Sequence, residues 1–208
     1  MSLAFEDVLG VRDAFQGLPM AGRTDSWILS DAAGVHGVAL ERPVLDRFEQ
    51  AYLGRLRQEI ETPGDSRKGV MPGVRELLDA LSDRADVFLA LLTGNYEKAA
   101  RIKLEYFDLW RYFRCGAFGD QAPDRNGLLP RALTIVASCG GPAFATTDAV
   151  VIGDTPLDVE CAKFSHARSI GVATGLHSAD ELRAAGADVV FADLSDTEDV
   201  LRALNVQV

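Results

Sequence analysis

The stretch from Ala149 to Lys163 decides the fold and reads Ala-Val-Val-Ile-Gly-Asp-Thr-Pro-Leu-Asp-Val-Glu-Cys-Ala-Lys. Apolar residues run into Gly153, carboxylates follow at Asp154 and Asp158, and a helical pattern begins at once. This order predicts a buried strand, a tight turn and a helix. Both acids are then expected at the carboxyl end of the strand, where parallel α/β sheets bind their ligands.

The two carboxylates have two interpretations. Converging carboxylates suit a hard, oxygen-seeking cation such as Mg²⁺, so Asp154 and Asp158 are candidate metal ligands. Alternatively, Asp154 caps the following helix, Pro156 occupies its first turn, and Asp158 complements the helix dipole. The stretch alone does not separate a metal site from a well-capped helix.

Composition limits the classes of function. A chain of 208 residues with 48% hydrophobic content fits one domain with an inserted subdomain. Its net charge is 21 − 31 = −10, which disfavours nucleic acid and anionic membranes as partners but leaves small anions possible. No apolar run approaches the roughly 20 residues of a membrane span. The three cysteines have no paired spacing, so a reducing, cytoplasmic location is expected.

The first third of the chain shows only helical patterns. We expect residues 1–14 to be the remnant of a first core helix, and residues 15–70 to form a small helical cap. A segment rich in proline and glycine is expected to link this cap to the rest of the chain. The patterns are a helix over 2–9 closed by Gly10, a short helix within 17–33 capped by Thr24, a helix over 42–61 and the linker over 62–73.

Beyond the linker, strand and helix patterns alternate. This alternation predicts an α/β fold, a Rossmann-like doubly wound parallel sheet over residues 71–208. Strands are expected at 87–92, 115–118, 149–152, 169–173 and 188–191. Helices are expected at 74–81, 97–107, 128–138, 158–164, 179–185 and 197–204.

A second polar cluster, Thr93-Gly94-Asn95, lies between a predicted buried strand and a helix start. Free backbone N–H groups and the helix dipole favour an anion there, and the Thr93 hydroxyl could bind a phosphate oxygen. The alternative is that Thr93 or Asn95 simply caps the helix. Lys103, on the same helix, could neutralise a phosphate or be an ordinary exposed lysine, and Arg125 and Lys163 are weaker candidates.

The order of these motifs resembles the haloacid dehalogenase (HAD) superfamily, and in particular its phosphoglycolate-phosphatase-like branch. The resemblance covers nearly the whole chain, and Gly22-Arg23-Thr24-Asp25 is similar to that branch's entry into its cap. It implies that Asp154 and Asp158 hold Mg²⁺. It also implies that Thr93, Gly94 and Asn95 bind the transferring phosphoryl group and that Lys103 steadies its charge. Many relatives carry this lysine just ahead of the acid-pair strand, but residues 115–148 contain none, which favours Lys103.

One departure from the family pattern is large. The family's reaction begins from an Asp-x-Asp pattern at the end of a first strand, and no such pattern occurs in this sequence. Glu6 and Asp7 lie in a predicted helix, and Asp25 and Asp31 lie in the expected cap. The absent strand would lie between the strands at 87–92 and 149–152, so we expect a gap of roughly 9 to 10 Å there unless the neighbours close up.

The resemblance therefore leaves two hypotheses. We favour a Mg²⁺-dependent phosphatase that hydrolyses a small phosphomonoester, phosphoglycolate or a related metabolite, through an aspartyl-phosphate. The nucleophile would then lie upstream of this chain, which opens within a helix and would by itself be nearly inactive. The alternative is a catalytically dead remnant that acts as a binding or interaction protein. A dehalogenase would not need the acid pair. Arg23 could contact a substrate carboxylate or be a surface arginine.

Overall fold

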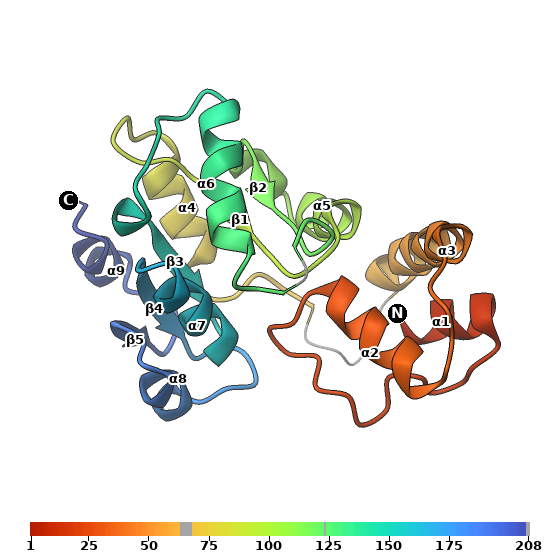
Figure 1. Cartoon of the computed structure of the whole chain (residues 1–208). Helices are drawn as coiled ribbons and strands as arrows, with labels where there is room; N and C mark the ends of the chain where they lie inside the picture. The colour runs from red at the N-terminus through yellow and green to blue at the C-terminus, as the bar shows by residue number, and fades with distance from the viewer. Residues whose placement is uncertain (63–67, 123, 207–208) are drawn as a thin grey trace.

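The computed structural model describes residues 1–62, 68–122 and 124–206. Figure 1 shows two parts, a helical unit at one side and a larger α/β unit beside it. The helical unit contains α1 (Ser2–Leu9), α2 (Asp25–Val35) and α3 (Arg42–Glu61). The linker expected over 62–73 includes residues 63–67, which lie outside the described residues.

The α/β unit alternates strands and helices, which confirms the predicted fold class. Its regular elements are α4 (Val74–Ser82), β1 (Leu91–Leu92), α5 (Glu97–Tyr106), β2 (Gly116–Ala117), α6 (Leu128–Ser138), β3 (Val150–Gly153), α7 (Pro156–Phe164), β4 (Arg168–Val172), α8 (Ala179–Ala185), β5 (Val189–Phe191) and α9 (Thr197–Ala203). Two 3₁₀ turns, η1 (Trp110–Tyr112) and η2 (Thr146–Asp148), lie between them. No helix in the described part of the chain has the length and apolar character needed to cross a membrane.

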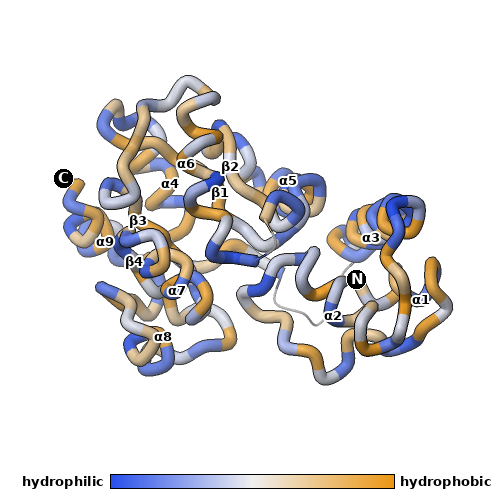
Figure 2. Tube along the Cα trace, viewed as in Figure 1, coloured by the Kyte–Doolittle hydropathy of each residue, from blue (hydrophilic) through white to orange (hydrophobic). Residues whose placement is uncertain are grey.

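The helical unit is held together by an aromatic core. Phe5 and Phe48 are fully buried, and their ring centroids lie 6.2 Å apart in an edge-on arrangement. In Figure 2 the α3 tube alternates between hydrophobic and hydrophilic residues, as expected for a helix with one buried face. Helix α1 therefore packs with α2 and α3, which differs from the expectation that residues 1–14 belong to the core. The reason is that Ala4 and Phe5 bury their side chains among these aromatic residues.

The strands form two separate parallel ladders. One has the order β3-β4-β5, with Ile152 opposite Ile170, and the other pairs β1 with β2. Among the described residues β1 and β3 do not pair, and Ile152 is 37% exposed although it lies within a strand. This break falls where the sequence predicted the missing strand. Within the described residues, the strand expected over 87–92 is paired only at Leu91 and Leu92, which lie opposite Gly116 and Ala117 of the short strand β2.

Local capping and buried apolar side chains fix the start of α7. Thr155 and Asp158 form a reciprocal capping box, and Pro156 occupies the first turn. Val159 on the inner face of α7 is 1% exposed, and Ile170 on β4 is equally buried. Burying such a side chain contributes about 1.5 to 3 kcal/mol, so the turn after β3 is held on a rigid base.

Candidate active site

A pocket of about 600 Å³ lies between the helical unit and the carboxyl ends of β1 and β3. The structure brings the site residues favoured by the sequence to this one pocket. Those residues are Arg23, Thr93, Gly94, Asn95, Lys103, Asp154 and Asp158. Met1 and Ser2 also line it, as do Asp25 and the weaker candidate Arg125.

The acid pair occupies the turn between β3 and α7. The backbone N–H and the hydroxyl of Thr155 donate to Asp158 Oδ2 at 3.0 and 2.8 Å. The hydroxyl of Thr155 also accepts from the Asp158 N–H, so the residue that caps α7 is Thr155 and not Asp154. A side chain at Gly153 would overlap the Asp158 carboxylate, so this glycine makes room for it. Asp154 is therefore left facing the pocket.

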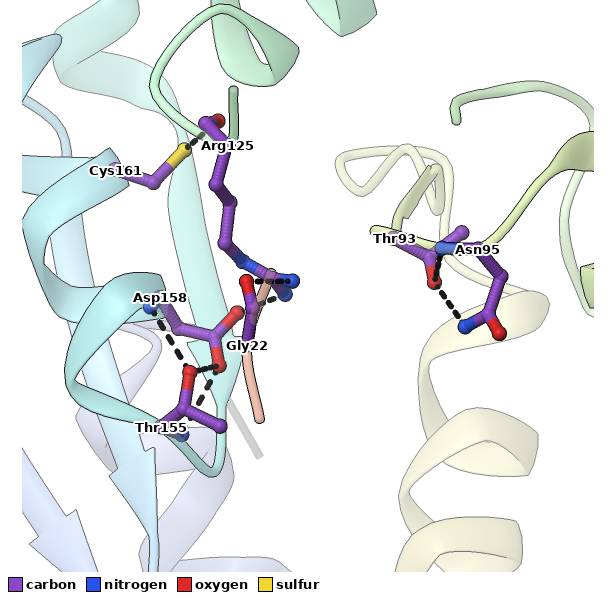
Figure 3. Close-up of polar contacts among 7 residues, drawn as sticks. All are labelled: Gly22, Thr93, Asn95, Arg125, Thr155, Asp158 and Cys161. Carbon is purple, nitrogen blue, oxygen red and sulfur yellow. Dashed lines mark hydrogen bonds and ion pairs between the residues drawn. The ribbon is translucent and has the colours of Figure 1, made fainter. Parts of the chain in front are cut away.

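Arg125 is the ion-pair partner of Asp158 (Figure 3). Its guanidinium donates to Asp158 Oδ1 and, at 3.0 Å, to the carbonyl oxygen of Gly22, and its side chain is only 13% exposed. The Cys161 thiol donates a hydrogen bond to the backbone carbonyl oxygen of Arg125 at 3.1 Å. Sequence reasoning ranked Arg125 below Lys103 because it looked for a lysine in this region. The sequence did contain a signal for Arg125, because it is a basic residue in the segment that precedes the strand of the acid pair.

The charges around Asp154 are unbalanced. Partial desolvation by the pocket walls raises the pKa of Asp154, and the nearby charge of Asp158 raises it further. Arg125 and His177 act in the opposite direction, but the net shift is upward. The raised pKa means that burial and the neighbouring carboxylate disfavour the charged form of Asp154, so the site would gain from an added cation.

The Thr93 hydroxyl is the centre of a second polar group (Figure 3). The backbone N–H and the side-chain amide of Asn95 donate to Thr93 Oγ1 at 3.2 and 2.9 Å. Lys103 Nζ in turn donates to Asn95 Oδ1. Burial lowers the pKa of Lys103, and Asp25 partly opposes that shift. Lys103 is thus not an ordinary surface lysine, and neither Thr93 nor Asn95 caps α5.

Asp25 is a pocket residue that sequence reasoning missed. It is 6% exposed, its carboxylate accepts from the Tyr96 N–H at 2.9 Å, and its own N–H donates to the Gly94 carbonyl oxygen at 2.6 Å. Burial raises its pKa, while Tyr96 and Lys103 act in the opposite direction. Asp25 follows a helix cap directly, so in the sequence it resembles an acid that complements a helix dipole. Its contacts fasten the helical unit to the loop after β1.

Arg23 lies in the pocket wall contributed by the helical unit. It donates to Asp31 Oδ2 at 2.5 Å, and its guanidinium carbon lies 4.2 Å from the centroid of the Trp27 ring. Its side chain is 20% exposed. Arg23 therefore faces the pocket as one member of an ion pair rather than as a bare cation.

Comparisons with known proteins find similar hydrolases. A family model described as HAD-hydrolase-like matches residues 128–197. A probable phosphatase, IndB from Dickeya dadantii, is 29% identical over 98% of this chain and 82% of its own length. A phosphoglycolate phosphatase from Pseudomonas syringae pv. tomato is 27% identical over 79% of this chain, which spans only 55% of that relative.

Solved structures show the same fold. A predicted phosphoglycolate phosphatase from Haemophilus somnus gives a TM-score of 0.62 at 18% identity, covering 96% of this chain and 87% of that one. A hydrolase from Pseudomonas syringae gives a TM-score of 0.63 at 21% identity, covering 98% and 90%. The family model and the phosphatase relatives support the resemblance to the HAD superfamily that the sequence motifs predicted, and the solved structures share its fold.

The donor set is compatible with a magnesium ion that shares its ligands with phosphate. Within residues 1–62, 68–122 and 124–206, no three His, Cys, Asp or Glu side chains gather as a complete metal cage. Mg²⁺ is usually bound by one or two carboxylates together with phosphate and water oxygens, and Asp154 is a pocket-lining carboxylate of this kind, while the oxygens of Asp158 accept from Arg125 and Thr155. A side chain at Gly175 would overlap the Asp154 carboxylate, so this glycine also keeps the site open.

Proposed function

We propose that this chain forms the cap and core of a Mg²⁺-dependent phosphatase that hydrolyses a small phosphomonoester through an aspartyl-phosphate. One observation carries the proposal: a single pocket contains the Thr93 hydroxyl, the cations Lys103 and Arg125, and the carboxylates Asp154 and Asp158. Cations and hydroxyl donors are complementary to a phosphoryl group, whose charge must be stabilised during transfer. The names of the relatives, which include phosphatases, agree with this chemistry.

Each residue has a role in the proposal. Thr93 Oγ1 already accepts from two N–H groups of Asn95, so its own hydrogen is free to be donated to a phosphate oxygen. Lys103 supplies positive charge to the phosphate, and Arg125 compensates the charge of Asp158 beside it. Asp154 and Asp158 would hold Mg²⁺, which when bound neutralises phosphate charge and favours attack at phosphorus.

The covalent step needs a nucleophile that the family takes from an Asp-x-Asp strand. We propose that this strand fits between β1 and β3, where the described ladders do not pair. A carboxylate oxygen would attack phosphorus, the ester P–O bond would break, and the second aspartate would give its proton to the leaving alcohol. Water then attacks the aspartyl-phosphate, which releases phosphate and restores the carboxylate.

The test is an extension of the chain before Met1 by an apolar strand that ends in Asp-x-Asp. With Mg²⁺ present, we expect the extended protein to hydrolyse p-nitrophenyl phosphate. The matched control replaces the first aspartate of the extension by asparagine, which keeps its size and removes the nucleophile. A folded extended protein that stays inert with Mg²⁺ would contradict the enzymatic proposal.

A non-catalytic module that binds phosphate and Mg²⁺ is the second candidate. It is favoured by the lack of any Asp-x-Asp pattern in the sequence. The same extension separates the two candidates, because a remnant would bind inorganic phosphate before and after extension and would never turn over an ester.

A further inference from the structure

The pocket wall that the helical unit contributes is mostly apolar. Its side chains include Phe15, Ile28, Tyr52 and Leu56. Ile28 and Tyr52 are 4% and 6% exposed, so the wall is packed from behind and does not collapse into the space. A volume of about 600 Å³ is within the range of pockets that hold drug-sized ligands.

The charges on this side do not favour a second anion. Arg23 is a cation in this wall, and its guanidinium is engaged by Asp31 at 2.5 Å and stacked on Trp27. Asp25 contributes a further buried acid to the same wall. A ligand carboxylate would have to compete with Asp31 for Arg23 while lying near Asp25.

We propose that the substrate of this site is a phosphomonoester whose alcohol part is uncharged and carries apolar surface. The inference rests on the proposed function and deepens it by naming the substrate class. Phosphoglycolate, whose alcohol part is a small carboxylate, fits this wall poorly, although relatives at 27% identity carry that substrate in their names. The ion pair between Arg23 and Asp31 acts as the specificity element, because it cancels the charge that a carboxylate would need.

The direction of discrimination follows from elementary physical chemistry. An aromatic or aliphatic group gains free energy when it leaves water for an apolar wall. A carboxylate beside Arg23 loses hydration, lies near the buried acid Asp25 and finds Arg23 already paired with Asp31. We therefore expect the pocket to bind phenyl phosphate at least tenfold more tightly than phosphoglycolate.

Calorimetric titration of the chain in the presence of Mg²⁺ tests the inference without requiring turnover. The probes are inorganic phosphate, phenyl phosphate and phosphoglycolate, with inorganic phosphate as the reference for the phosphate subsite. Asp31→Asn frees Arg23 and should tighten phosphoglycolate binding about fivefold to tenfold, while inorganic phosphate binding stays as in the unmodified chain. Adding Arg23→Met to Asp31→Asn should abolish that gain.

The outcomes separate the two proposals. If inorganic phosphate does not bind, the proposed function fails and the substrate class fails with it. If inorganic phosphate binds but phosphoglycolate binds as tightly as phenyl phosphate, only the substrate class is overturned. The Asp31→Asn variant should melt at the same temperature as the unmodified chain if it is correctly folded. If such a folded variant binds phosphoglycolate no more tightly than the unmodified chain, the role of the ion pair is overturned.

Discussion

Replacing Arg125 by methionine removes the cation that compensates the acid pair. The side chains of Arg125 and Asp158 are only 13% and 5% exposed, so the variant leaves a carboxylate without its cation beside Asp154. Breaking a buried ion pair by removing one partner costs about 3 to 5 kcal/mol. The pocket admits water, so we expect the lower end, about 3 kcal/mol. At about 2 to 4 °C per kcal/mol, the melting temperature should fall by roughly 6 to 12 °C.

The assay is unfolding by urea and by heat, followed by circular dichroism with and without Mg²⁺. Mg²⁺ should stabilise Arg125→Met more than the unmodified chain, because a bound cation replaces the missing charge. The double variant Arg125→Met with Asp158→Asn should recover part of the lost stability, since it removes both charges together. Asp158→Asn keeps a side-chain oxygen that can accept the hydrogen bonds of Thr155.

Two results would refute this reasoning. If Arg125→Met is as stable as the unmodified chain, the guanidinium does not compensate the buried carboxylate. If Mg²⁺ stabilises both proteins equally, the acid pair is not where the ion binds. Either result would leave Asp158 with its role in the capping box of α7 alone.

Three further predictions concern the rest of the pocket and its supports. Lys103→Met and Asn95→Ala should each weaken inorganic phosphate binding about tenfold in calorimetric titrations. If Lys103 acts through Asn95, the double variant should lose no more phosphate affinity than either single variant. Additive losses of affinity would indicate that Lys103 contacts phosphate directly. Asp25→Asn should be more stable than the unmodified chain at pH 7, because burial raises the pKa of this carboxyl and its ionisation opposes folding. The stability difference in urea unfolding should shrink as the pH falls through the raised pKa towards the ordinary value, and a difference that does not depend on pH would contradict the assignment. Gly94→Ala should lower the melting temperature because its methyl group would overlap a backbone carbonyl of the helical unit, whereas the control Gly54→Ala has open space on α3 and should stabilise by up to about 1 kcal/mol.

Much of the architecture could be predicted because its signals are local. The strand, turn and helix over residues 149–163 form as expected, since apolar runs, a capping box and a proline at the helix start act within one or two turns. Helices α3 and α6 begin and end where their patterns predicted. The sequence also predicted that Thr93 and the acid pair lie at the same ends of parallel strands, and they line one pocket although β1 and β3 belong to separate ladders.

Only the tertiary structure decided how these groups are partnered. Arg125 meets Asp158 across 33 positions of sequence, and Asp25 accepts from the Tyr96 N–H across 71, so no local pattern could reveal either contact. The packing of α1 with α3 likewise depends on aromatic side chains from distant helices. Periodicity and capping are short-range effects within one chain segment, whereas ion pairing and burial depend on which segments the fold brings side by side.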